Sequence, residues 1–259
     1  MQSDKTSLRY MLLHGARHPA RVVPYVRRSV RNRFLASGVR DHVDFYRRVM
    51  TKDAVGNPGA AIGSPDPESW LAIGELQFEY LLRHGLAPSN RLLEIGCGNL
   101  RAGWRFIDYL EAGHYVGLDI SPDILLAAQA VVAERELRQK TPYLHLVADL
   151  RLDFLPERHF DVVHAHSVFT HSPIGVIEEC LEHVGRVMRP DGFFDLTYFS
   201  TSGNPYDRHR EDFYYRTEEL VALARRFGYD AEVRDDWSYS QPKLRLRLAR
   251  ADVPNQRRG

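Results

Sequence analysis

Apolar positions along the chain follow two periods, and the two alternate from about residue 69 onward. Residues 69–86 carry apolar side chains three and four positions apart, which predicts a helix that ends at Gly85, a typical helix C-terminal residue. Short apolar runs then alternate with segments of helical period. The runs predict strands at 91–96, 115–120, 143–149, 160–166 and 192–199, and helices at 101–113, 121–137 and 174–188. Strands that alternate with helices form a mostly parallel sheet.

The last part of the chain breaks this alternation. Residues 216–229 predict a final helix, and two strand-like runs at 231–237 and 243–251 are close enough to form an antiparallel hairpin at one edge. Residues 200–216, rich in Gly, Pro, aromatic and charged residues, predict a loop of functional length. The pattern therefore predicts an α/β, Rossmann-like, doubly wound and mostly parallel seven-stranded sheet with an antiparallel C-terminal hairpin and a helical N-terminal extension.

The N-terminal extension is basic and amphipathic. Arginines occur between residues 21 and 40 with no acidic residue among them, and valines and a phenylalanine between 22 and 34 form an apolar stripe at helical spacing. Such a segment is open to two interpretations. It contacts an anionic membrane surface or another polyanion, or it packs on the domain with a solvated charged face, which is the commoner arrangement. A Gly- and Pro-rich loop at 54–69 separates it from the body.

Composition excludes several classes of protein. With 44% hydrophobic and 27% charged residues over 259 positions, the chain can bury a large core. Its net charge of +1 and its lack of a nucleic-acid motif give no reason to expect nucleic acid as a partner. Cys97 and Cys180 lack the paired spacing of a zinc site, so we expect no metal and a reducing, cytoplasmic location. No apolar run has the length of a membrane-spanning helix.

Three acidic residues stand at the ends of three consecutive predicted strands. Glu94 is followed at once by Gly96 and Gly98, which allow a sharp turn and a close approach to a ligand. Asp119 follows the glycines by about 20 residues, the separation at which an acid reaches ribose hydroxyls. Asp149 ends the third strand and can accept from an exocyclic amine. A dinucleotide loop would have a third glycine and no acid to repel a pyrophosphate, so these acids favour an adenosine with a positive substituent.

The motifs that carry these residues resemble a known family. LLEIGCGNLRAG, YVGLDIS, VADL, FDVVHAHSVFTH and VMRPDGFFDLTYF are similar, in order and spacing, to the motifs of class I S-adenosylmethionine-dependent methyltransferases. The resemblance covers residues 70–251, which we take as the methyltransferase domain between the arm at 1–69 and a flexible tail at 252–259. More narrowly, the loop resembles a bacterial branch acting on small molecules or glycans. Its departure is Asn99-Leu100-Arg101, where a third glycine often stands.

The resemblance implies a role for each matching residue. The loop residues Glu94, Gly96, Cys97, Gly98 and Arg101 would hold the methionine part of S-adenosylmethionine. The other cofactor residues would be Asp119 for the ribose, Ile120, Asp149 and Leu150 for the adenine, and His166 and Ser167 at the methyl-transfer face. Asp149 has a simpler interpretation as an exposed acid that caps the turn after it.

The chemistry needs few catalytic groups because the cofactor is already activated. For a hydroxyl acceptor, a histidine near neutral pKa could remove the proton. His171, after the fourth strand, is the first candidate, although it could also be a helix-entry residue bonded to the backbone. Strand alternation places His166 on the same side as His164, and Tyr206 could close over the acceptor. These three side chains, His171, His166 and Tyr206, are the predicted catalytic residues.

The sequence therefore predicts methyl transfer to a small-molecule acceptor, through a hydroxyl oxygen of a sugar, phenol or lipid-linked compound. The alternative is a catalytically silent Rossmann-like protein whose basic arm binds an anionic membrane surface. A nicotinamide oxidoreductase on a similar sheet is a third option, and the glycine spacing speaks against it. The identity of the acceptor and the oligomeric state stay open.

Overall fold

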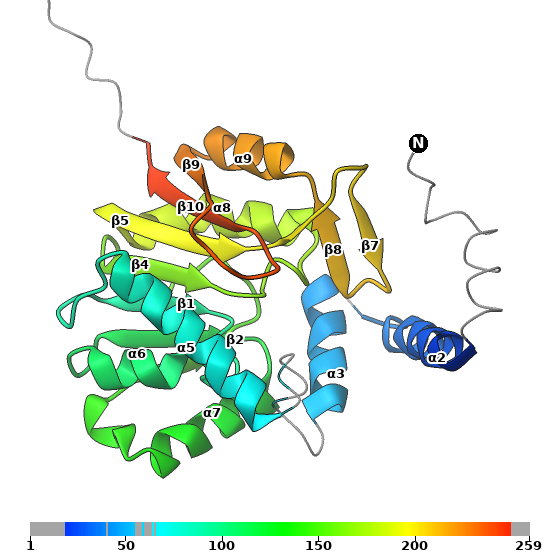
Figure 1. Ribbon diagram of the computed structural model, residues 1–259, viewed down its shortest axis with the longest axis horizontal. Helices are drawn as coiled ribbons and strands as arrows, with labels where there is room; N and C mark the ends of the chain where they lie inside the picture. The colour runs from blue at the N-terminus through cyan, green and yellow to red at the C-terminus, as the bar shows by residue number, and fades with distance from the viewer. Residues whose placement is uncertain (1–18, 40, 55–58, 60–63, 65, 250–259) are drawn as a thin grey trace, which may run out of the picture.

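The architecture is that of a computed structural model (Figure 1). It describes residues 19–39, 41–54, 59, 64 and 66–249. Within these residues, a seven-stranded sheet has the order β3-β2-β1-β4-β5-β10-β9. Its strands are β1 Leu92–Ile95, β2 Tyr115–Asp119, β3 Tyr143–Leu146, β4 Phe160–Ala165, β5 Met188–Thr197, β9 Tyr229–Arg234 and β10 Lys243–Leu248.

The sheet confirms the predicted fold class. Strands β1 to β5 pair in parallel, whereas β10 pairs antiparallel with both β5 and β9. The chain order reverses beside β1, where the connection from β3 crosses to β4 on the other side. In open parallel sheets, ligands bind at such a reversal, outside the carboxyl ends of the strands.

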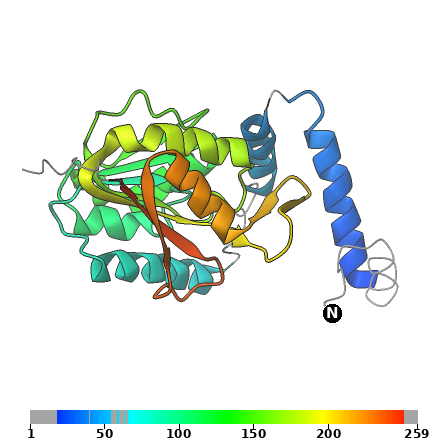
Figure 2. The same cartoon turned by 90° about the horizontal axis from the view of Figure 1, so that it is seen from above.

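Helices cover both faces of this sheet (Figures 1 and 2). Helices α5 Pro67–Arg83, α6 Gly103–Tyr109 and α7 Pro122–Glu134 share one apolar core with the sheet, and the short helix η1 Leu137–Lys140 joins it. Helices α8 Ile174–Val187 and α9 Thr217–Arg226 share the other core. Asp66 caps the N-terminus of helix α5, where its side chain accepts from the Ser69 amide. The helix ends before Gly85, whose φ of +91° suits a glycine.

Residues 200–216 differ from the predicted loop. They contain most of a second, three-stranded sheet, formed by β6 Phe199–Ser200, β7 Tyr206–Arg208 and β8 Asp212–Tyr215. These strands have only two to four residues, too few for an alternating pattern to stand out in the sequence. The small sheet connects the C-terminal end of β5 with α9.

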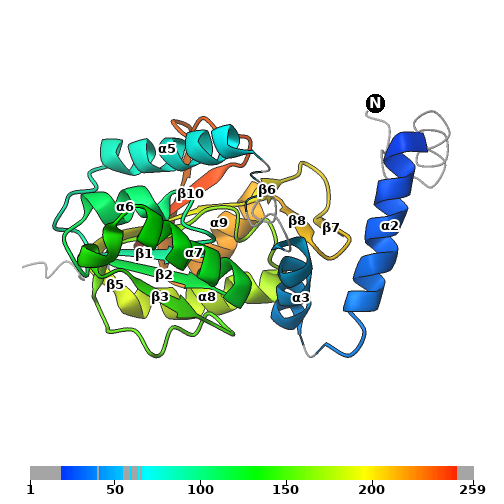
Figure 3. The ribbon, with the colours of Figure 1, turned by 90° about the horizontal axis from the view of Figure 1, so that it is seen from below.

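Two helices precede α5 among the described residues of the N-terminal extension. The expected basic helix is α2 Pro19–Leu35, and a second helix, α3 His42–Ala54, was not predicted. Helix α2 stands at the periphery beside β7 and β8, whereas α3 lies against the strand ends of the large sheet (Figure 3). The predicted tail at 252–259 lies outside the described residues.

Candidate active site

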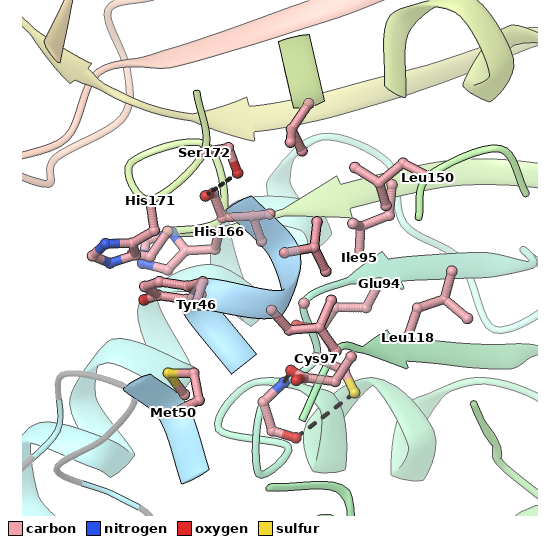
Figure 4. Close-up of a pocket in the computed structure, with 18 of the residues that line it drawn as sticks. Tyr46, Met50, Glu94, Ile95, Cys97, Leu118, Leu150, His166, His171 and Ser172 are labelled. Atoms are coloured by element: carbon pink, nitrogen blue, oxygen red, sulfur yellow. Dashed lines mark hydrogen bonds between the residues drawn. The ribbon is translucent and has the colours of Figure 1, made fainter. Parts of the chain in front are cut away.

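A cavity of about 760 Å³ lies at the carboxyl ends of the parallel strands. The turns after β1, β2 and β4 form its floor, and α3 forms its cover. Figure 4 shows Tyr46 of α3 beside His171, with Met50 farther along the same helix. The cavity is lined by all the residues predicted to bind the cofactor: Glu94, Gly96, Cys97, Gly98, Arg101, Asp119, Ile120, Asp149, Leu150, His166 and Ser167.

Glu94 is a buried acid at the end of β1. Its side chain is 4% exposed, and one carboxylate oxygen, Oε2, accepts a hydrogen bond from the hydroxyl of Tyr115 on β2. Burial raises the pKa of Glu94 to about 8, although the Tyr115 hydroxyl and the Arg101 charge both favour the ionised form. A carboxylate held this way would gain strongly from a cation in the cavity.

Asp119 connects the turns that follow β1 and β2. One carboxylate oxygen accepts from the Gly98 amide at 3.0 Å, and the other accepts from the Ser121 amide at 2.8 Å. Burial raises the pKa of Asp119 to about 6, against the effect of these amides. Each oxygen keeps a lone pair for a further donor, so ribose hydroxyls can be accommodated.

Glycine is required at position 96 for two reasons. Its φ is +69°, a backbone conformation that residues other than glycine rarely adopt. A Cβ at this position would also lie 2.4 Å from Cγ2 of Val168. The close approach that the glycine permits in the structure is therefore to Val168 of the β4–α8 turn. Gly98 also has a positive φ, of +57°.

The two other loop residues are buried beside the glycines. Cys97 is 3% exposed, and burial raises the pKa of its thiol well above the usual range, so it is a neutral packing group here. Arg101 is 8% exposed and donates to the hydroxyl of Ser64 at 2.9 Å. Burial lowers the pKa of Arg101, and the carboxylate of Glu94 opposes that effect.

The predicted adenine residues lie at the outer end of the cavity. Asp149 is exposed and accepts from the amide of Arg151 at 3.2 Å, which is the capping arrangement noted as its simpler interpretation. Leu150 is 7% exposed, and its amide donates to the carboxylate of Glu179 on α8 at 2.9 Å. Glu179 also lines the cavity and was not predicted.

Helix α3 is attached to the strand ends by Arg47. Its guanidinium donates to the carbonyl of Ile120 at 2.8 Å and to the carbonyl of Val147 at 3.3 Å. These carbonyls follow β2 and β3, so one side chain anchors the helix across both. Tyr46, one residue earlier, lines the cavity and stacks on His171 with ring centroids 5.3 Å apart.

The two histidines at the end of β4, His164 within the strand and His166 just after it, are arranged as strand alternation predicts. His164 and His166 stack with centroids 6.4 Å apart, and both are at least nine-tenths buried. His164 bonds to Gln77 at 3.0 Å and does not line the cavity. His166 lines the cavity, and neither of its ring nitrogens has a partner among the described residues. Burial lowers the pKa of both well below the usual range, so both are neutral.

His171 is held in one orientation by the second sheet. Its Nδ1 lies 2.9 Å from the carbonyl oxygen of Glu211 and 3.3 Å from Oδ1 of Asp212. An Nδ1 proton shared with these two acceptors leaves Nε2 as the basic nitrogen of the neutral ring. The hydrogen bond from His171 lowers the pKa of Asp212, against the effect of burial. His171 therefore combines both interpretations: its ring bonds to the backbone, and the residue lines the cavity.

Tyr206 lies outside the cavity lining, on the exposed strand β7. It stacks on Tyr214 with centroids 4.5 Å apart, and Tyr214 stacks on Phe199 at 5.0 Å. Phe199 does line the cavity and meets His171 edge-on at 6.2 Å. The row of rings therefore connects Tyr206 with the cavity wall, although Tyr206 itself does not reach the cavity.

Several site residues were missed by the sequence analysis. The spacing of Phe45, Val49 and Met50, all buried, is a helical signal that could have revealed α3 and with it Tyr46 and Arg47. No local signal could have found Asp212, because its role depends on a contact with a side chain 41 positions earlier in the chain. Gln241, which accepts from Ser167 and Thr197, is likewise brought in by the fold alone.

Comparison with known proteins finds similarity to methyltransferases. The family described as methyltransferase domain matches residues 93–194, which run from β1 into β5. An uncharacterised methyltransferase of Schizosaccharomyces pombe is 27% identical over 120 residues, covering 44% of this chain and 41% of that protein. The chain therefore spans less than half the length of this curated relative.

Solved structures share the architecture at low sequence identity. Magnesium protoporphyrin IX methyltransferase from Synechocystis PCC 6803, with bound SAH, has a TM-score of 0.60 at 15% identity, covering 80% of this chain and 100% of that one. Phosphoethanolamine N-methyltransferase 2 of Haemonchus contortus has a TM-score of 0.58 at 19% identity, with 76% and 46% covered. The 1,6-didemethyltoxoflavin-N1-methyltransferase of Burkholderia thailandensis has a TM-score of 0.56 at 18% identity, with 79% and 89% covered.

These similarities establish the fold, and the fold and the family match define the class. Residues 93–194 match a methyltransferase domain, and the sheet around them has the fold of the S-adenosylmethionine-dependent methyltransferases named above. The chain's narrower likeness to a bacterial branch stays a prediction.

In the part of the chain that the structure describes, no three His, Cys, Asp or Glu side chains are grouped as they would be to hold a metal ion. None of the helices described is both long and apolar enough to cross a bilayer.

Proposed function

We propose that the chain transfers a methyl group from S-adenosylmethionine to a hydroxyl oxygen of a small molecule. The observation that carries the proposal is the meeting of two buried acids, Glu94 and Asp119, at one cavity beside the Gly96–Gly98 turn. Both acids have a raised pKa because their burial outweighs the neighbouring groups that favour the ionised forms. A site of this kind suits a ligand that brings a positive charge and a pair of hydroxyls.

The residues at the cavity fit the cofactor part by part. We assign the methionine end to Glu94 and the Gly96–Gly98 turn, and the ribose to Asp119. Ile120 and Leu150 supply apolar contact for the adenine, and Asp149 is placed to accept from its amine. When bound, the cofactor supplies an electrophilic methyl group on a sulfonium.

His171 is our candidate for the general base. Asp212 and the Glu211 carbonyl hold its Nδ1 proton, so Nε2 is left to take the proton of an acceptor hydroxyl. The bound cofactor would supply the methyl group to that oxygen, the carbon–sulfur bond would break, and S-adenosylhomocysteine would be the product. Asp212 then stabilises the imidazolium that results. His166, a neutral ring with no described partner, is proposed to line the transfer face.

Burial and the α3 cover support a reaction shielded from water. Tyr46 and Met50 line the cavity from α3, and Phe199 lines it from β6. An apolar wall of this kind excludes water and positions a ring-bearing acceptor, which are the main tasks in methyl transfer. The relatives named above include enzymes described as acting on nitrogen, so oxygen as the acceptor rests on the His171 arrangement.

Two experiments test the proposal in order. Equilibrium dialysis with S-adenosylmethionine should give micromolar binding to the full chain, and Asp119→Ala should weaken it at least about tenfold, because a charged hydrogen-bond acceptor is lost. Incubation with methyl-labelled cofactor and fractionated cell extract, followed by mass identification, should then label a small molecule at oxygen. Label in protein or RNA would contradict the acceptor class. Binding without any labelled product would favour the catalytically silent alternative.

A further inference from the structure

Helix α2 is attached to the body by its polar side. Arg28 and Arg31 both form ion pairs with Glu211, and Asn32 donates to the same carboxylate. Arg31 also pairs with Asp53 at the end of α3, at 2.6 Å. Glu211 is 2% exposed, so the contact is fully desolvated on its acidic side. Residues 28, 31 and 32 lie on one helical stripe, which fixes the side of α2 that faces the protein.

Two large apolar residues of α2 consequently face outward. Phe34 is 79% exposed and Val30 is 65% exposed, the two highest values among the large apolar residues described. Arg27 and Arg33, which flank them, are exposed as well. Figures 2 and 3 show α2 projecting beyond the other helices and strands of the described part of the chain. A helix packed for stability alone would bury Val30 and Phe34 and expose its arginines.

Charge is distributed unevenly between residues 5–40, the basic part of the arm, and the rest of the chain. Residues 5–40 contain nine Lys and Arg residues and no acid, whereas the remaining residues contain 26 Lys and Arg against 34 Asp and Glu. An anionic surface would therefore attract the arm and repel the body, which orients the molecule. A second copy of the chain is a poorer occupant, because it would bring two basic helices together.

We propose that the outward side of α2 binds the surface of an anionic lipid bilayer. Val30 and Phe34 would enter the boundary between headgroups and acyl chains, while Arg27 and Arg33 pair with lipid phosphates. The Glu211 contacts hold the helix to the body from the opposite side, so binding needs no rearrangement of the cavity. The inference is independent of methyl transfer, since vesicle binding can be measured without cofactor or acceptor.

Co-sedimentation of the full chain with vesicles tests the proposal. Vesicles of phosphatidylcholine with phosphatidylglycerol should bind the chain, and vesicles of phosphatidylcholine alone should not. The double substitution Val30→Ser and Phe34→Ser, which changes no charge, should weaken the partitioning about tenfold or more, because two exposed apolar side chains no longer reach the bilayer. Arg27→Gln with Arg33→Gln should weaken it to a similar degree and reduce its dependence on salt.

Leu126→Ser is the matched control. Leu126 is 63% exposed on α7, another helix, and its substitution should leave vesicle binding unchanged. Equal binding of the wild-type chain and the Val30→Ser, Phe34→Ser variant would overturn the proposal, since contact would then be electrostatic only. A dimer that light scattering detects in the wild type and not in this variant would also overturn it, because the occupant would then be a second copy.

Discussion

His171, which lines the cavity, meets Asp212 with Nδ1 and Oδ1 3.3 Å apart. The first follows β4 of the large sheet, and the second begins β8 of the small sheet. A residue of the small sheet therefore orients a side chain in the connection that follows β4. In this arrangement the carboxylate, the imidazole and an acceptor hydroxyl would lie in line for proton transfer.

The His171 arrangement predicts a selective loss of catalysis. His171→Gln should lower kcat about 10²-fold or more, because the basic nitrogen is removed, while the affinity for S-adenosylmethionine stays unchanged. Asp212→Asn should cause a smaller loss, since the Glu211 carbonyl still accepts from Nδ1. Single-turnover methyl transfer and dialysis separate the two quantities. His183→Gln, on α8 away from the cavity, is the control, and a loss of cofactor affinity in His171→Gln would contradict the assignment.

Asp119 predicts that cofactor affinity depends on pH. Because burial raises the pKa of this carboxyl to about 6, it takes up a proton as the pH falls through 6 and then accepts fewer hydrogen bonds. Affinity for S-adenosylmethionine should be about tenfold lower at pH 5 than at pH 7.5 if the ionised form binds. Calorimetry at both values measures this. Asp149→Asn should keep the pH dependence, whereas Asp119→Asn should bind weakly at both values; a pH-independent wild type would rule out the role.

Glu94 predicts a stability that decreases as the pH rises. Its pKa of about 8 in the folded protein lies above the ordinary value of 4.5, so the folded state holds this proton more tightly than the unfolded state does. The stabilisation is complete below pH 4.5 and is lost as the pH rises toward 8. Between pH 5 and pH 8 the cofactor-free wild type should lose ~3.5 kcal/mol more unfolding free energy than Glu94→Gln. Urea titrations measure the difference, which Glu134→Gln, an exposed position on α7, should not reproduce.

Gly96 predicts a steric conflict that a second substitution relieves in part. Gly96→Ala should destabilise the fold by about 1–3 kcal/mol, because φ is +69° and the new methyl group would meet Val168 at 2.4 Å. Val168→Ala in the same chain should recover part of the loss by removing the contact, and the backbone strain should persist. Gly175→Ala on α8, where a methyl group meets nothing within 4 Å, should be neutral or slightly stabilising in the same thermal denaturation experiment. Additive losses in the double variant would show that the contact with Val168 is unimportant.

Much of the fold could be predicted because its signals are local. Alternating periods marked the strands and helices of the large sheet, and α8, for example, matches its predicted range within one residue. The small sheet could not be predicted, because β6 and β7 are two and three residues long and are formed through pairing with β8. Helix α3 was missed although its buried positions carry a helical signal.

The cofactor side of the site was also accessible from the sequence. Glu94, Gly96 and Asp119 stand at strand ends, and parallel strands bring their carboxyl ends to one edge. The acceptor side was less accessible. Tyr206 was predicted at the cavity and lies outside its lining, whereas Asp212 was not predicted and orients His171.

The sequence by itself determined the order of strands and helices, the acids at the strand ends and the concentration of basic residues in the arm. These properties depend on residue type and spacing, which the chain carries before it folds. Tertiary structure decided which side chains meet. It joined His171 to Asp212, placed Val168 against Gly96 and turned Val30 and Phe34 of α2 outward by binding the opposite side of the helix to Glu211. Contacts between residues far apart in the chain arise only from packing, so no local pattern could have specified them.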